Sequence, residues 1–131
     1  MAVKNKYLGI ITREIIWAKE DATAYEIAKI MKDNNVGIVV IMRNEEIAGI
    51  VSERDITRRV VAQGIDPESI QAKDFMTKEV VTVEFKEGLN KIYQKLCEIN
   101  FRHLLITDNG KLVGITSRRD LLDALAAKNK W

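Results

Sequence analysis

"GIVSERD" at residues 49–55 and "GITSRRD" at residues 114–120 place nearly the same seven letters twice in one small chain. The likeness extends outward from both phrases. At an offset of 65 positions the two halves align without a gap, and "ITREII" at residues 11–16 falls on "MTKEVV" at residues 76–81. Self-similarity at a fixed spacing is the signature of a duplicated structural unit. We therefore predict two similar repeats, residues 8–66 and residues 73–131.

Each repeat is predicted to form a strand, a helix, two strands and a second helix. The first helix should begin at Thr23, because threonine three residues before Glu26 is typical of a helix N-cap. "GIVVIM" at residues 37–42 and "HLLIT" at residues 103–107 are apolar runs of strand length, as expected of buried strands. "DNG" at residues 108–110 favours a tight hairpin. The pattern predicts an α/β protein of tandem β-α-β-β-α repeats, packed with internal pseudo-twofold symmetry.

Composition excludes several classes of function. The chain of 131 residues has a formal net charge of +2 and no concentrated basic stripe, which argues against nucleic-acid binding. No apolar run approaches the roughly 18 residues of a membrane span, and no signal peptide is recognised, so we expect a cytoplasmic protein. Cys97 is the only cysteine and His103 the only histidine, so neither a disulfide nor a metal site within the chain is expected. Cys97, in an apolar helical pattern, should be buried.

The repeated phrase has a purely structural interpretation. Ser-x-x-Asp at the start of a helix resembles a capping box. Ser52 and Ser117 would then accept hydrogen bonds from the backbone, and Asp55 and Asp120 would favour the positive end of the helix. The glycine of each phrase would relieve crowding in the preceding strand.

The same phrase can also be interpreted as a nucleotide site. Arg54, Arg118 and Arg119 fall in a first helical turn, where the helix dipole disfavours cations unless an anion is bound there. Arginine binds phosphate through two parallel hydrogen bonds. The carboxylate of Asp55 or Asp120 can accept from two hydroxyls at once, which is what the 2′ and 3′ hydroxyls of a ribose offer. Catalysis is not expected, because no nucleophile has a base near it in the pattern.

The chain resembles the CBS-domain pair, named after cystathionine β-synthase. The resemblance rests on the tandem arrangement, on "MTKEVVTV" at residues 76–83, on "RHL" at residues 102–104 and on the seven-letter phrase in both repeats. It implies a regulatory module without catalytic activity that senses an adenosine-containing ligand: AMP, ADP, ATP or S-adenosylmethionine. The ligand would lie in clefts between the two packed repeats. A homodimer and an unidentified protein target are also implied.

The resemblance assigns the family's ribose-binding acid to Asp55 and Asp120 and its phosphate-side hydroxyl to Ser52 and Ser117. It places the threonine that opens each repeat at Thr12 and Thr77. The full set of expected ligand-binding residues is Thr12, Ile16, Gly37, Ile38, Ser52, Arg54, Asp55, Thr77, Val81, Arg102, His103, Ser117, Arg118, Arg119 and Asp120.

The sequence also departs from the family pattern. Val40 and Leu105 stand where proline is frequent, and Trp17 stands where the second repeat has Thr82. These departures change the shape expected for the adenine slots. They leave open an alternative function, a protein–protein interaction scaffold that keeps the fold and has lost ligand binding.

The two repeats differ in charge beside the phrase. Glu53 corresponds to Arg118, and Ile38 corresponds to His103. A carboxylate near a phosphate is repulsive and a guanidinium is attractive, so the second repeat is expected to dominate the binding of phosphorylated ligands.

Apolar helical faces favour a homodimer. Ile56 and Val60 in the first repeat, with Leu121 and Leu125 in the second, are expected to exceed what one small core can hide.

Overall fold

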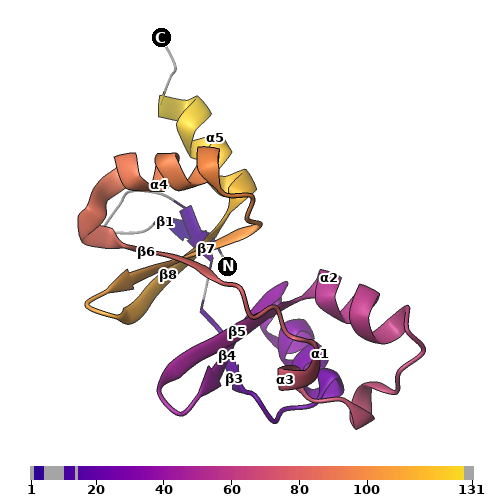
Figure 1. Ribbon diagram of the computed structural model, residues 1–131. Coiled ribbons are helices and arrows are strands. Elements are labelled where there is room, and N and C mark those ends of the chain that lie inside the picture. Colours follow the sequence, from indigo (N-terminus) through magenta and orange to yellow (C-terminus); the bar gives the residue numbers. More distant parts are fainter. Residues whose placement is uncertain (1, 5–10, 14, 129–131) are drawn as a thin grey trace. The chain divides into compact units, whose positions relative to one another are not determined.

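The computed structural model describes residues 2–4, 11–13 and 15–128, which form two compact units (Figure 1). The central unit is Ile15–Glu79. The terminal unit combines the described residues of Met1–Glu14 with those of Val80–Trp131. Each unit has its own sheet and its own apolar core.

The central unit follows the predicted order of elements. It contains β3 (Trp17–Lys19), α1 (Ala24–Asn34), β4 (Ile38–Arg43), β5 (Glu46–Ser52) and α2 (Glu53–Ile56). Its sheet has the order β3-β4-β5, with β3 parallel and β5 antiparallel to β4. The π-helix η1 (Thr57–Val61) continues α2, and η2 (Pro67–Ser69) and α3 (Ala72–Phe75) follow. The sequence did not indicate α3, which is four residues long and lies at the start of the predicted second repeat.

Local signals set the ends of α1. The Thr23 hydroxyl accepts a hydrogen bond from the Glu26 amide at 3.1 Å, and Asn35 ends the helix in the left-handed conformation with φ of 53°. Asparagine tolerates that conformation better than most residues. Ala24, Ile27 and Met31 are buried, so one face of α1 packs into the core.

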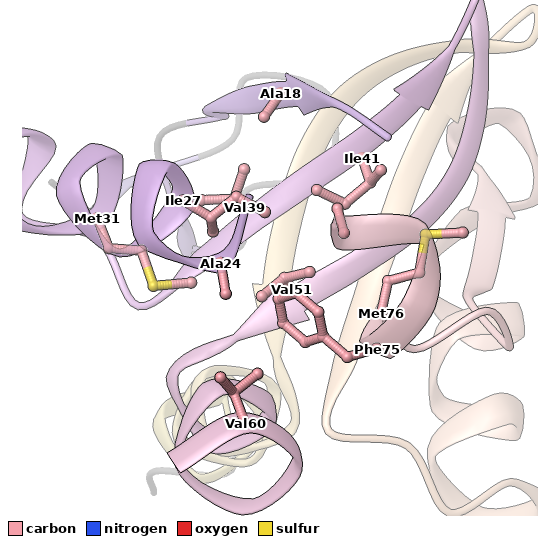
Figure 2. Packing of buried hydrophobic residues seen from close by; sticks show 11 residues of the cluster. Ala18, Ala24, Ile27, Met31, Val39, Ile41, Val51, Val60, Phe75 and Met76 are labelled. Carbon is pink, nitrogen blue, oxygen red and sulfur yellow. The ribbon is translucent and has the colours of Figure 1, made fainter. Parts of the chain in front are cut away.

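The core of the central unit also draws on the chain after the first repeat. Ala72, Phe75 and Met76 are almost fully buried among the side chains of α1, β4 and β5. Figure 2 shows Phe75 and Met76 pointing into the same cluster as Val51 and Ile41. The first repeat therefore completes its core with residues that precede the strand of the second.

The terminal unit repeats the same plan and adds two short strands. It contains β6 (Val81–Glu84), η3 (Phe85–Glu87), α4 (Gly88–Glu98), β7 (His103–Asp108), β8 (Lys111–Ser117) and α5 (Arg118–Lys128), with β1 (Ala2–Lys4) and β2 (Ile11–Arg13) from the start of the chain. Its sheet has the order β1-β2-β8-β7-β6. Asn109 and Gly110 both have positive φ, which confirms the predicted hairpin between β7 and β8. The core centres on Ile92, Leu104, Ile106 and Leu121.

The segment that opens each sequence repeat belongs to the unit of the other repeat. Thr77 exchanges backbone hydrogen bonds with Ile50 of β5, at 3.0 and 2.8 Å. In the terminal unit β2 pairs with β8 in the same antiparallel sense. A Cβ atom on Gly49 would stand 2.7 Å from the Thr77 carbonyl oxygen, so this close crossing requires glycine. The compact units and the sequence repeats thus differ in which opening segment they contain.

The residues expected to supply a dimer surface are placed differently by the structure. Val60 and Leu121 are fully buried, each in the core of its own unit, and Ile56 packs against the central core. The side chain of Leu125 lies outside the described part of the chain. Val60 and Leu121 thus pack inside their own units and offer no surface to a second copy. The homodimer stays a prediction that no longer rests on them.

Cys97 is a second point of difference. Its side chain is exposed, where the apolar helical pattern of the sequence predicted burial. The apolar stripe of α4 buries Ile92 and Leu96, and Cys97, one residue further on, faces away from it. Over the described ranges, His, Cys, Asp and Glu side chains form no group of three that could hold a metal ion, and no helix there is both long and apolar enough to cross a membrane.

Glu84 holds the β7–β8 hairpin. Its Oε1 atom accepts hydrogen bonds from the Gly110 amide at 3.2 Å and from the Thr107 hydroxyl at 3.3 Å. Burial by itself would raise the pKa of the Glu84 carboxyl. Hydrogen bonds from the Gly110 and Asn109 backbone and from Thr107, with the charge of Lys86 nearby, outweigh burial and hold this pKa below its ordinary value.

We expect Phe75→Ala to destabilise the full chain by about 3–5 kcal/mol, because it removes a large side chain from the closed core of the central unit. Urea unfolding measures this free energy. Val61→Ala is the control: Val61 is 61% exposed, and its truncation should change the stability by less than about 0.5 kcal/mol. Equal effects of the two substitutions would show that α3 does not belong to the core.

Glu84→Gln should destabilise the protein near neutral pH and much less in acid. A carboxyl whose pKa is lowered by folding contributes stability that is complete above its unfolded pKa, about 4.3, and is lost as the pH falls through the lower folded value. Thermal unfolding of the wild type and the variant between about pH 7 and pH 3 tests this. Glu45→Gln, at the hairpin tip of the central unit, should show no such convergence; a gap for Glu84→Gln that stays constant with pH would contradict the assignment.

Candidate functional site

The phrase of the central unit forms the predicted capping box. The Asp55 amide donates to the Ser52 hydroxyl at 3.2 Å, and the Ser52 amide donates to Asp55 Oδ2 at 2.9 Å. Ser52 ends β5 in extended geometry, so it turns directly into α2. The structural interpretation of the phrase is therefore present in this unit, and any binding role of these two residues has to coexist with it.

Asp55 has further partners that come from distant parts of the chain. The Thr77 hydroxyl lies 3.1 and 3.2 Å from its two carboxylate oxygens, and Arg59 Nε lies 3.6 Å from Oδ1. The Ser52 hydroxyl is also within hydrogen-bonding distance, at 3.2 Å from Oδ2. Asp55 is only 8% exposed, so these groups, rather than water, solvate its carboxylate.

The remaining expected residues of the central unit lie around the start of β4. Ile38 pairs with Ser52 across the β4–β5 ladder, and the Gly37 carbonyl accepts from the Glu53 amide at 3.0 Å. The Ile16 carbonyl accepts from the Val40 amide at 2.8 Å. Arg54 is exposed on α2.

The terminal unit repeats the serine cap of this turn. The Asp120 amide donates to the Ser117 hydroxyl at 3.0 Å, and Asp120 is 8% exposed. His103 pairs with Ser117 across the β7–β8 ladder, and the Arg102 carbonyl accepts from the Arg118 amide at 2.9 Å.

Two further expected residues lie on the strands of this unit. Val81 begins β6 and pairs with Leu104. Thr12 lies in β2, and its side chain is outside the described part of the chain.

Each unit has a cavity beside its phrase, and the two cavities differ in chemistry. The cavity of the terminal unit has a volume of about 760 Å³ and that of the central unit about 500 Å³. The larger one is lined by Asn100, Phe101, Arg102, His103, Ser117, Arg118, Arg119, Leu122 and Asp123. It brings together five of the expected ligand-binding residues, whereas the smaller one includes only Gly37. The smaller cavity carries one cation and one anion, Lys32 and Glu53.

Arg118 is already engaged in structural contacts. Its guanidinium donates to the carbonyls of Leu96 at 2.8 Å and Ile99 at 3.2 Å, and it lies 5.4 Å from the centre of the Phe101 ring. The first two contacts satisfy carbonyls at the C-terminal end of α4. A cation there also interacts favourably with the negative end of the helix dipole. Arg102 and Arg119 are exposed and line the same cavity.

Arg59 is a residue of the central site that sequence reasoning missed. Besides approaching Asp55, its Nη1 atom donates to the carbonyls of Phe75 at 3.1 Å and Met76 at 3.3 Å. The comparison of repeats carried no signal for it, because the equivalent position of the second repeat is Ala124. The only hint was the (i, i+4) spacing between Asp55 and Arg59 on one helix.

We expect Arg118→Ala to destabilise the chain by about 1.5–3 kcal/mol, because it removes charged hydrogen bonds to two carbonyls at the end of α4. Chemical denaturation measures the change. Arg119→Ala is the matched control, since Arg119 is exposed and should cost less than about 0.5 kcal/mol. A stability loss no larger than that of the control would show that Arg118 does not hold this helix end.

Sequence comparison finds relatives across bacteria, archaea and plants. A protein of Acidianus ambivalens is 37% identical over 123 residues, which cover 92% of this chain and 73% of that protein. A protein of Methanopyrus kandleri is 36% identical over 115 residues, which cover 86% of this chain and 59% of that protein. The mitochondrial CBS domain-containing protein CBSX3 of Arabidopsis thaliana is 28% identical, with 58% of its length matched. The chain thus spans somewhat under two thirds of several relatives.

Solved structures and the family profile agree with these relatives. A CBS-domain protein of Burkholderia ambifaria has a TM-score of 0.75 at 30% identity, covering 92% of this chain and 88% of that one. A CBS domain protein of Pyrobaculum aerophilum, complexed with AMP, has a TM-score of 0.71 at 31% identity, covering 88% and 93%. The profile of the CBS domain matches residues 3–62 and 72–127. With both repeats matched and the fold shared with solved members, the chain belongs to the CBS-domain family.

Proposed function

We propose that this chain is a regulatory module that binds an adenosine-containing ligand and catalyses no reaction itself. The candidate ligands are AMP, ADP, ATP and S-adenosylmethionine. CBS-domain pairs are regulatory modules, and the similar protein of Pyrobaculum aerophilum is complexed with AMP. The repeats at residues 8–66 and 73–131 would be the two sensing units, and the signal would pass to a protein target.

The observation that carries this proposal is the cavity of the terminal unit. Its volume of about 760 Å³ falls within the usual range for small-molecule sites, roughly 300–1,000 Å³. It is lined by the guanidinium groups of Arg102 and Arg119, by His103 and by the Ser117 hydroxyl. Cations and hydroxyls gathered at a helix start favour an anionic group such as phosphate.

The two aspartates would hold ribose hydroxyls. Asp120 lies three residues beyond Ser117 on the first turn of α5, and its equivalent Asp55 lies three residues beyond Ser52. In this arrangement the serine side of the turn faces the phosphate and the carboxylate accepts from the diol. The exposed Arg54 would approach a phosphate in the central unit, as Arg119 would in the terminal unit.

The charge difference between the cavities supports a dominant terminal site. Arg118 itself is held by α4, so the attraction falls to Arg102, Arg119 and His103 rather than to Arg118. In the central unit Glu53 lines the cavity at the position equivalent to Arg118 and would repel a phosphate.

We expect Asp120→Ala to weaken AMP binding at least tenfold and Asp55→Ala to weaken it less, since a charged hydrogen bond is worth roughly 1.5–3 kcal/mol. Titration calorimetry of the full chain at matched salt gives both affinities. The Ser117 cap is kept in Asp120→Ala, because the donor to Ser117 is the backbone amide of residue 120.

Arg119→Ala separates phosphate recognition from ribose recognition in the same experiment. It should weaken AMP and leave adenosine nearly unchanged, because adenosine has no phosphate. Equal losses for Asp55→Ala and Asp120→Ala would show that the wrong unit was chosen. An absence of binding for all four candidate ligands would favour an interaction scaffold instead.

A further inference from the structure

Donors from its own chain already occupy most of the acceptor sites of the Asp55 carboxylate. A carboxylate offers about four lone-pair sites. The Ser52 amide at 2.9 Å, the Ser52 hydroxyl at 3.2 Å and the Thr77 hydroxyl at 3.1 Å donate to Asp55, and Arg59 Nε forms an ion pair with it at 3.6 Å, too long for a hydrogen bond. A ribose needs two of these sites for its vicinal hydroxyls. Three hydrogen-bond donors leave about one site open, so the diol can enter only by displacing at least one of them.

The donors differ in how readily they can leave. The Ser52 amide and hydroxyl both belong to the capping box, in which the hydroxyl also accepts from the Asp55 amide, and they stay. Thr77 and Arg59 reach Asp55 through side chains, from a segment and a helix that are held by other bonds as well. The Thr77 hydroxyl is shared between both carboxylate oxygens, and Arg59 stands 3.6 Å away with a side chain that is 52% exposed. These two partners are the ones that a ligand would replace.

Thr77 and Arg59 also anchor one short stretch of chain. Arg59 donates to the carbonyls of Phe75 and Met76, immediately before Thr77. Release of the Thr77 hydroxyl and of the whole Arg59 side chain would leave Met76 and Thr77 held by the backbone bonds of Thr77 to Ile50, by the bond from the Met76 amide to the Ala72 carbonyl at 2.8 Å and by the buried Met76 side chain. Three residues after Thr77 the chain passes into the terminal unit.

We propose that Thr77 and Arg59 form an internal latch on Asp55, which a ligand's vicinal diol opens by taking their place on the carboxylate. The inference rests on the proposed function, because it assumes that Asp55 accepts a ribose. The latch lowers the affinity of the central site and makes its occupancy loosen the segment that leads into β6. Arg59 gives the central repeat a partner that the second repeat lacks in sequence, since Ala124 occupies the equivalent position.

The latch and a direct ligand contact predict opposite changes in ligand affinity when the Thr77 hydroxyl is removed. If the Thr77 hydroxyl bound the ligand, its removal would weaken binding. If it competes with the ligand for Asp55, Thr77→Val should tighten binding, because one competing donor is gone while the shape of the side chain is kept. The gain should require the diol, since the diol is the group that replaces the hydroxyl.

The test titrates adenosine and 2′-deoxyadenosine into the full chain carrying Asp120→Ala, so that the central site is observed. Thr77→Val should tighten adenosine about three- to tenfold and leave 2′-deoxyadenosine unchanged. Arg59→Met should act in the same direction. Arg58→Met is its matched control: it removes the same charge one residue away, from an exposed side chain that does not contact Asp55, and should change neither affinity.

Hydrogen exchange supplies a readout that a purely structural role would not move. Adenosine should speed exchange of the Met76 and Thr77 amides in the chain with Asp55 intact, and Asp55→Asn should remove that response. Slower exchange at these amides, or weaker or unchanged adenosine binding by Thr77→Val, would overturn the latch while AMP binding by the wild type still upheld the proposed function.

Two other outcomes separate the latch from the function. If the Asp120→Ala chain binds no adenosine and the same chain with Thr77→Val added does bind it, the latch is strong enough to close the site. If the wild type, the Asp120→Ala chain and the Asp120→Ala chain with Thr77→Val all bind neither adenosine nor AMP, both proposals are overturned together.

Discussion

The backbone pairing of Thr77 with Ile50 is the constraint on which the central unit depends. It lays the opening segment of the second repeat against β5, and the segment brings Ala72, Phe75 and Met76 with it into the core. Gly49 is required by the same crossing, because the Thr77 carbonyl oxygen occupies the space of a side chain. A repeat of about sixty residues has a marginal core by itself, and borrowing three buried side chains offsets that shortage.

The same crossing decides the surroundings of Asp55. Without Thr77 beside β5, the carboxylate would have its own capping box and the (i, i+4) contact with Arg59 only. With it, a buried acid acquires a hydroxyl donor from a residue 22 positions away. A buried charge needs such partners, so a group that we propose as a ribose acceptor also helps to hold the fold. Competition between stability and binding is common at functional sites.

Duplication kept the backbone plan and allowed the charges to diverge. Both units turn from a strand into a helix through Ser-x-x-Asp with the serine as cap. Around that shared turn, arginines line the cavity of the terminal unit. In the central unit Glu53 lines the cavity, and Arg59 forms an ion pair with Asp55. Arg118 shows that charge alone does not assign a role, because its guanidinium is already hydrogen-bonded to a carbonyl at the end of α4. The two units therefore surround the same turn with different charged partners.

The sequence by itself determined the order of elements, the caps and the repeat. Period and spacing are local properties, so Thr23, Asn35 and the Asn109–Gly110 turn could be predicted from their neighbours. The repeated phrase likewise identified Ser52, Asp55, Ser117 and Asp120 as the residues to examine. Only the tertiary structure decided which opening segment completes which unit, that Val60 and Leu121 are buried in their own cores, and that Arg59 reaches Asp55 and the carbonyls before Thr77. The physical reason is that hydrogen-bond partners and burial depend on what distant chain segments bring alongside, and no local pattern records that.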